Sequence, residues 1–279
     1  MKIDDETFSA IVTGWTVMVV IILCVLLPFA VNVPTLPAGA YKVVSGQFPG
    51  LTRPDSHLTS FVPREPGGLL VWYDFEEEIG QTLWIPDASG NGNNAYVKGV
   101  FVRSGPGIAG GHSVFLPGTG LLWCPVNPAA GRTNITFSLW FTGGSIAGNN
   151  YEIAGAVAGT EPRTGWTLGT RVSELWDDDG NAIRTQAASP PADDLPSAGW
   201  NHKALVYNGT HVTEYLNGAP VNVYAASGMP VGGGEEVMTI GSWRPFGQNY
   251  AGQVDEFRIY DRALRPDELA ALYREGSRS

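Results

Sequence analysis

GQVDEFRIYDRALRPDELAALY, residues 252–273, is the stretch of sequence that decides the fold. Between residues 253 and 260 the pattern alternates, so Phe257 and Ile259 share one face of a predicted strand while Glu256 and Arg258 share the other. A proline and two acidic residues then predict a helix over 265–273. Three roles are open for the carboxylates of this stretch: catalysis, metal binding, or support of a strand–helix corner.

The composition favours an all-β protein that does not bind nucleic acid. The 279 residues include 36 Gly, 20 Pro, 9 Trp and 10 Tyr, which is typical of many short strands joined by turns. The formal net charge of −10 opposes nucleic-acid binding, because such binding needs clustered Lys and Arg. Cys24 and Cys124 lie in different parts of the chain and predict no disulfide framework.

From residue 69 onward, short alternating or aromatic segments follow one another, each bounded by Gly, Asn, Asp or Pro. The predicted strands lie within 69–75, 95–102, 113–117, 135–141, 166–172, 202–208, 211–218 and 237–243. DASGNGNNA (87–95) has the composition of a turn. The spacing predicts two antiparallel sheets in a sandwich or jelly roll.

The order of these segments matches that of a known family. The landmarks are VWYDFEEEIG (71–80), SVFLPG (113–118), TFSLWF (136–141), WNHKALVYNG (200–209) and the quoted stretch 252–273. Over residues 69–273 the chain resembles the LamG-like, concanavalin A-like lectin/glucanase family. The resemblance implies an all-β, two-sheet antiparallel jelly-roll domain at 69–275, with one concave sheet, before a short tail at 276–279. Arg265 departs from the small hydroxyl residue expected to cap the final helix, at a cost of up to ~2 kcal/mol.

An uncharged run of 22 residues, 10–31, follows a short acidic tail at 1–9 and predicts a single transmembrane helix. Trp15 suits the membrane interface at one end, and Pro28 is tolerated near the other. The alternative is a cleaved signal peptide, but the acidic tail and the length of the run oppose it. Charges flanking the run nearly balance, so the family resemblance leads us to expect a cytoplasmic N-terminus and an extracytoplasmic domain.

The segment 32–68 is rich in proline and predicts an extended linker, since neither a helix nor a central strand tolerates that pattern. We expect it either to lie along a partner in a membrane protein complex or to wrap its own domain. The residues expected to contact such a partner are Pro34, Pro37, Tyr41, Phe48 and Pro49.

The family resemblance implies a structural Ca²⁺ as the one candidate cofactor. Its expected ligands, from motifs at the two ends of the domain, are Asp74, Glu76, Asp87 and Asp255. The alternative is that these carboxylates cap turns and pair with arginines. The acidic run at 177–179 is interpreted as a hairpin tip.

Catalytic motifs are missing from the sequence. Glycosidases that share this jelly roll carry E-x-D-x-x-E on one strand, a pattern that this chain lacks, so we predict a protein that is not an enzyme. His202 fits the family's Trp-x-His strand as a structural residue. The candidates for stacking on sugars are Trp123, Trp166, Trp176 and Trp243.

Two functions follow from these observations. The first is a non-catalytic, membrane-anchored subunit of a larger membrane complex, for which we favour a photosynthetic reaction-centre–antenna host although no motif carries that choice. The second is a membrane-tethered lectin that binds glycans through its loops or its concave face.

Overall fold

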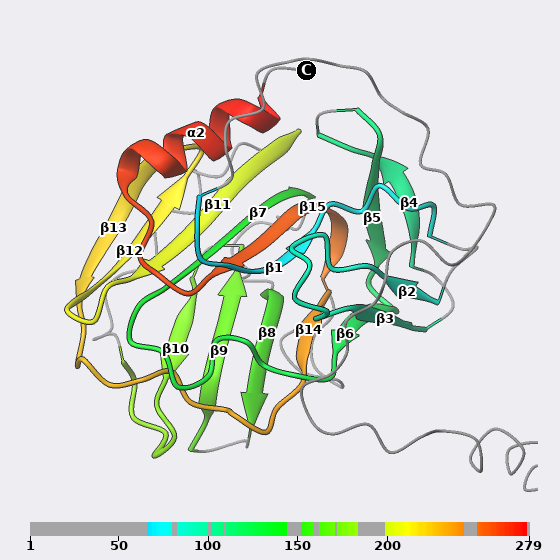
Figure 1. Cartoon of the computed structure of the whole chain (residues 1–279). Helices are drawn as coiled ribbons and strands as arrows, with labels where there is room; N and C mark the ends of the chain where they lie inside the picture. Colours follow the sequence, from blue (N-terminus) through cyan, green and yellow to red (C-terminus); the bar gives the residue numbers. More distant parts are fainter. Residues whose placement is uncertain are drawn as a thin grey trace, which may run out of the picture. The chain divides into compact units, whose positions relative to one another are not determined.

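The computed structural model describes residues 66–79, 83–99, 102–108, 110–143, 152–158, 162–170, 172–183, 199–242 and 250–277 (Figure 1). All of them belong to one unit of the chain, Ser60–Ser279. The predicted transmembrane helix with Trp15 and Pro28, and the predicted partner contacts of the linker, lie outside these residues. Within them, no helix is long and apolar enough to cross a membrane.

Two antiparallel sheets form the domain, as the spacing of the segments predicted (Figure 1). The eight-stranded sheet runs in the order β13 (Ala219–Ala225), β12 (His211–Leu216), β11 (Trp200–Tyr207), β7 (Ile135–Gly143), β15 (Ala251–Tyr260), β5 (His112–Pro117) and β4 (Arg103–Pro106), with β1 (Leu69–Tyr73) pairing with β15. The seven-stranded sheet runs in the order β10 (Glu174–Trp176), β9 (Thr164–Gly169), β8 (Glu152–Ala158), β14 (Met238–Ile240), β6 (Leu121–Cys124), β3 (Ala95–Lys98) and β2 (Trp84–Ile85).

The main hydrophobic core lies between the two sheets. Phe137 of β7 and Trp166 of β9 come from opposite sheets, and their ring centroids are 4.4 Å apart. Trp166 is fully buried and donates its indole N–H to Asn127 at 2.8 Å, which satisfies its polar group inside the core. The alternating apolar residues of each strand thus meet across the sandwich, in the arrangement expected for two packed sheets.

Strand β15 follows the predicted alternation only in part. Phe257 and Ile259 are fully buried in the core, as predicted, but Val254 is buried there as well. A β-bulge between Asp255 and Arg258 inserts one extra residue, and Glu256 within it has φ of 51°. The bulge therefore lets Val254 and Phe257, three residues apart, face the same core.

The predicted C-terminal helix is confirmed as α2 (Pro266–Gly276). Its apolar face, with Leu269 and Leu272, packs over the outer side of the eight-stranded sheet against Ala204, Val206 and Tyr260 (Figure 1). This second, smaller core explains why Tyr260 is buried although it points away from the sandwich interior.

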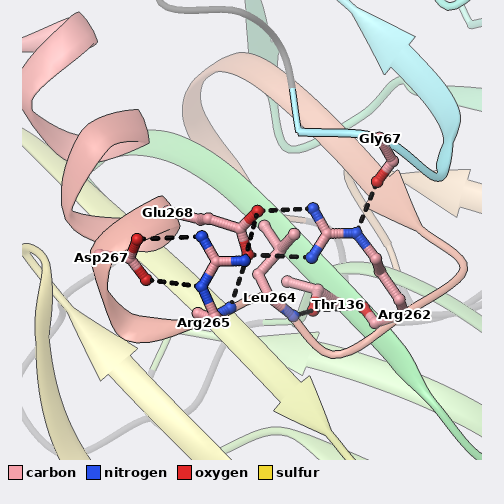
Figure 2. Close-up of polar contacts among 7 residues, drawn as sticks. All are labelled: Gly67, Thr136, Arg262, Leu264, Arg265, Asp267 and Glu268. Carbon is pink, nitrogen blue, oxygen red and sulfur yellow. Dashed lines mark hydrogen bonds and ion pairs between the residues drawn. The ribbon is translucent and has the colours of Figure 1, made fainter.

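Ion pairs hold the corner between β15 and α2 in place of a hydroxyl cap (Figure 2). Arg265 occupies the N-cap position without a side-chain cap, and its backbone N–H donates instead to Glu268 at 2.8 Å. Arg262 donates two hydrogen bonds to the same carboxylate, at 2.7 and 2.9 Å, and one to the carbonyl of Gly67. Thr136 of β7 completes the corner by bonding the backbone of Arg262 and Leu264. The missing hydroxyl at residue 265 is thus offset by a carboxylate one turn later.

Candidate functional site

Asp87, one of the four expected calcium ligands, caps a turn. Its carboxylate accepts backbone N–H groups from Trp72 at 2.9 Å and from Ser89 and Asn93 at 3.0 Å each. The side chain of Asn94 in turn accepts the N–H of Asp87. Asp87 therefore caps a turn, as the alternative to calcium binding predicted, and it connects the 87–95 turn to β1.

The other three expected ligands lie around the bulge of β15. The pKa of Asp255 is raised to about 8, mainly because burial disfavours its charged form; the charges of Glu256 and Glu76 act in the same direction, whereas the N–H groups of Ile108 and Glu256 lower the pKa. Each oxygen of Asp255 accepts one of these N–H groups at 2.8 Å. Asp74 acts in the same region, since its charge contributes to the raised pKa of Glu256. The charges of Glu76 and Glu256 thus act on Asp255, whereas Asp87 caps a turn at the start of the domain.

No group of three Asp, Glu, His or Cys side chains in the described segments is close enough to hold a metal ion. The oxygens of Asp87 and Asp255 are also already engaged by backbone N–H groups. The side chains therefore do not form a ready calcium site, and a calcium ion at this place stays a prediction. The acidic run at 177–179 is a hairpin tip, as predicted, because Asp177 accepts the N–H groups of Asp179 and Asn181.

Glu256 and Arg258 of the charged stretch 252–273 connect β15 to β1. Glu256 accepts the indole N–H of Trp72 at 2.8 Å and pairs with Arg258 at 2.7 Å. The guanidinium of Arg258 lies 4.7 Å from the centroid of the Trp72 ring. His202 is buried on β11, which is separated from β15 by β7; Ser138 of β7 contacts its Nε2 at 2.9 Å, and burial lowers its pKa to about 3. These contacts give Glu256, Arg258 and His202 a structural role. The absence of catalysis stays a prediction.

The outer face of the seven-stranded sheet carries the candidate site. Register aligns one residue of every strand in a single line across this sheet. From β2 to β10 the line is Trp84, Tyr96, Trp123, Thr239, Gly155, Thr167 and Glu174. Directly paired residues point to the same side of a sheet. Since their sequence neighbours Ile85, Ala95 and Leu122 lie in the core, this line points away from it.

The first three positions of this line are aromatic, and we name them the aromatic row: Trp84, Tyr96 and Trp123. Trp84 is 45% exposed and Tyr96 is 40% exposed, whereas Trp123 is half-buried. The ring centroids of Tyr96 and Trp123 lie 5.2 Å apart with the planes tilted by 35°. The next position, Thr239, is fully buried. Thr167 is buried as well, so the line is exposed at its aromatic end, on β2, β3 and β6, and partly exposed again only at Glu174 on the opposite edge strand (Figure 1).

Sequence reasoning found one residue of this surface and missed two. Of the four tryptophans expected to stack on sugars, Trp166 lies in the core, Trp176 is buried and Trp243 lies outside the described residues. Trp123 takes part, but Trp84 and Tyr96 were not predicted. Tyr96 alternates with the buried Ala95, and this period of two was the available signal.

Exposed apolar side chains that lie next to one another indicate a binding surface more often than apolar side chains scattered singly do. Aromatic rings offer flat apolar faces, and the tyrosine hydroxyl and indole N–H add hydrogen-bonding groups at their edges. Such a surface suits a ligand with a flat C–H face and hydroxyls around its rim, which describes a sugar ring. A protein partner with an apolar side chain is the competing ligand.

Comparison with known proteins identifies the domain. The model of the concanavalin A-like lectin/glucanases superfamily matches residues 118–270, which is more than half of the chain. No curated protein sequence matches the chain.

Solved structures share its fold. Domain 4 of AbnA, an extracellular arabinanase of Geobacillus stearothermophilus in complex with arabinotriose, has 20% identity and a TM-score of 0.56, covering 74% of this chain and 98% of that one. The binding domain of Paraclostridial Mosquitocidal Protein 1 has 17% identity and a TM-score of 0.56, covering 74% and 52%. The binding domain of botulinum neurotoxin DC in complex with SialylT has 14% identity and a TM-score of 0.57, covering 75% and 52%.

The match to the two toxin domains spans about half of their length, and identities this low show a shared fold alone. The superfamily match, the two-sheet sandwich and the strand–helix corner at 252–273 agree with one another. This chain belongs to the concanavalin A-like lectin/glucanase superfamily.

Proposed function

We propose that the domain is a non-catalytic carbohydrate-binding module and that the aromatic row is its binding surface. The observation that carries the proposal is the exposure of Trp84 and Tyr96 side by side on adjacent strands. Burial of such rings contributes to folding, so rings left exposed on a sheet are available for a ligand.

The structural neighbours support the choice of ligand. The arabinanase domain was solved with arabinotriose and the botulinum toxin domain with SialylT. Another structure of that toxin domain was solved with synaptotagmin II, a protein, so the fold by itself does not decide between a glycan and a protein. The exposed rings favour the glycan.

A glycan array probed with the full-length chain tests the proposal. We expect saturable binding that free oligosaccharide competes away, and we expect Trp84→Ala and Tyr96→Ala each to weaken it by about tenfold or more. Val223→Ala is the matched control, because Val223 is 62% exposed on β13 of the other sheet. A chain that binds no glycan, or whose binding survives both aromatic substitutions, would refute the proposal.

Membrane attachment remains a separate prediction. The anchor at 10–31, the linker and the orientation with an extracytoplasmic domain all concern residues outside the described part of the chain. Nothing in the described part favours a photosynthetic host. Detergent extraction followed by native electrophoresis tests the subunit hypothesis, which expects comigration with a large complex.

A further inference from the structure

The shape of the aromatic row limits what can lie on it, and this inference rests on the proposed function. Trp84, Tyr96 and Trp123 come from three neighbouring strands, which lie ~5 Å apart in any sheet. The row therefore runs across the strands and extends over ~10 Å. A surface of this length holds more than one sugar ring.

The two ends of the row differ. On the β14 side the line continues with Thr239, which is fully buried and donates its hydroxyl to the carbonyl of Ser242 at 2.8 Å. On the other side, β2 is the edge strand of the sheet, and Leu83 beside it is 79% exposed. A bound chain can therefore extend past the β2 edge, but its contacts end at Trp123.

The charge of the surface indicates the class of sugar. No member of the aromatic row is charged; Lys98 lies two residues from Tyr96 on the same side of β3, but the chain as a whole carries a formal net charge of −10. An anionic glycan would approach a protein of the same sign and meet aromatic rings in place of arginines. A neutral glycan avoids this repulsion and pairs its apolar ring faces with apolar rings.

We propose that the aromatic row binds a short segment of a neutral oligosaccharide that lies across β2, β3 and β6. One sugar ring stacks on Trp84 and the next on the Tyr96–Trp123 pair, so two linked sugars bind more tightly than one. Sugars with equatorial hydroxyls fit, since their C–H faces are flat. The remainder of the glycan extends beyond the β2 edge and contributes no affinity.

A length series measured by isothermal titration calorimetry with the full-length chain tests this. The probes are neutral gluco-, xylo-, manno-, galacto- and arabino-oligosaccharides, from the monosaccharide to the hexasaccharide, with sialyllactose and oligogalacturonides as anionic counterparts. Within the series that binds, we expect the disaccharide or trisaccharide to bind about tenfold more tightly than the monosaccharide, which is the gain from a second stacked ring. Longer chains should bind no more tightly, and added salt should change the affinity less than twofold.

Two variants separate stacking from general apolar contact. Trp84→Ala should remove the gain with length while leaving monosaccharide affinity in place, and Trp84→Phe should restore part of it. Leu83→Ala is the matched control: its side chain is exposed beside Trp84 but has no ring, and its loss should leave affinity unchanged. An affinity independent of length, a preference for the anionic glycans, or an equal loss from Leu83→Ala would overturn this inference while leaving glycan binding intact. Absence of binding to every probe would refute the proposed function itself.

Discussion

Replacing Glu268 with alanine tests how the strand–helix corner is held. The carboxylate accepts two hydrogen bonds from Arg262 and one from the N-cap backbone N–H of Arg265, and its side chain is only 14% exposed (Figure 2). Loss of a cap interaction costs ~1 kcal/mol. Loss of the partly buried, charge-assisted pair with Arg262 costs another ~1–1.5 kcal/mol. We expect Glu268→Ala to lower the free energy of unfolding by ~2 kcal/mol and the Tm by ~4–8 °C.

The measurement is urea denaturation at neutral pH, with Asp267→Ala as control. Asp267 also forms a two-bond pair, with Arg265 at 3.0 Å, but both side chains are more than 60% exposed. We expect no measurable change from that variant, because water replaces the lost bonds. Bonding to Arg262 also lowers the pKa of Glu268, so its contribution is present above the ordinary value of 4.5 and is lost as the pH falls through the folded pKa. If Glu268→Ala and Asp267→Ala lowered the free energy of unfolding equally, the burial of Glu268 would not be the reason for its contribution.

Three further predictions concern stability. The pKa of His202 is about 3 in the folded protein, against an ordinary value of 6.5. Because only the unfolded chain takes up the proton between these values, His202 should lower the free energy of unfolding by up to ~1.4 kcal/mol per pH unit as the pH falls from 6.5 to 3. Denaturation measured as a function of pH should show a smaller slope for His202→Gln. Asp255, with its pKa raised from 3.8 to about 8, contributes the opposite slope, so the two contributions offset each other between pH 3.8 and 6.5; the free energy of unfolding should fall as the pH rises from 6.5 to 8 in the native protein, and it should fall less in Asp255→Asn. Gly165→Ala should cost at least ~2 kcal/mol, since φ there is 105° and the added Cβ would meet the carbonyl of Ala156; an unchanged Tm would contradict this.

The sequence predicted most of the fold because the relevant signals are local. Alternation, turn composition and the proline that begins α2 each depend on residues within one segment, and they located that helix together with β1, β3, β5, β7, β9, β11, β12 and β14. The bulge at Glu256 was not predictable in this way, since alternation by itself assigns Val254 to the outer face. Its position depends on which residues of β7 and β1 lie opposite, which no single segment specifies.

The candidate site was harder to predict for the same physical reason. Trp84, Tyr96 and Trp123 are separated by turns and a hairpin in the sequence, and only the pairing of β2, β3 and β6 aligns them. The density of charged residues made 252–273 a candidate site, but Glu256 and Arg258 of that stretch form an ion pair with each other in the eight-stranded sheet. Burying a charge is costly unless it is paired, so dense charge beside a core is first of all a sign of pairing. Exposed aromatic rings on a sheet lack such a structural explanation, and they are therefore the stronger evidence for a ligand in this domain.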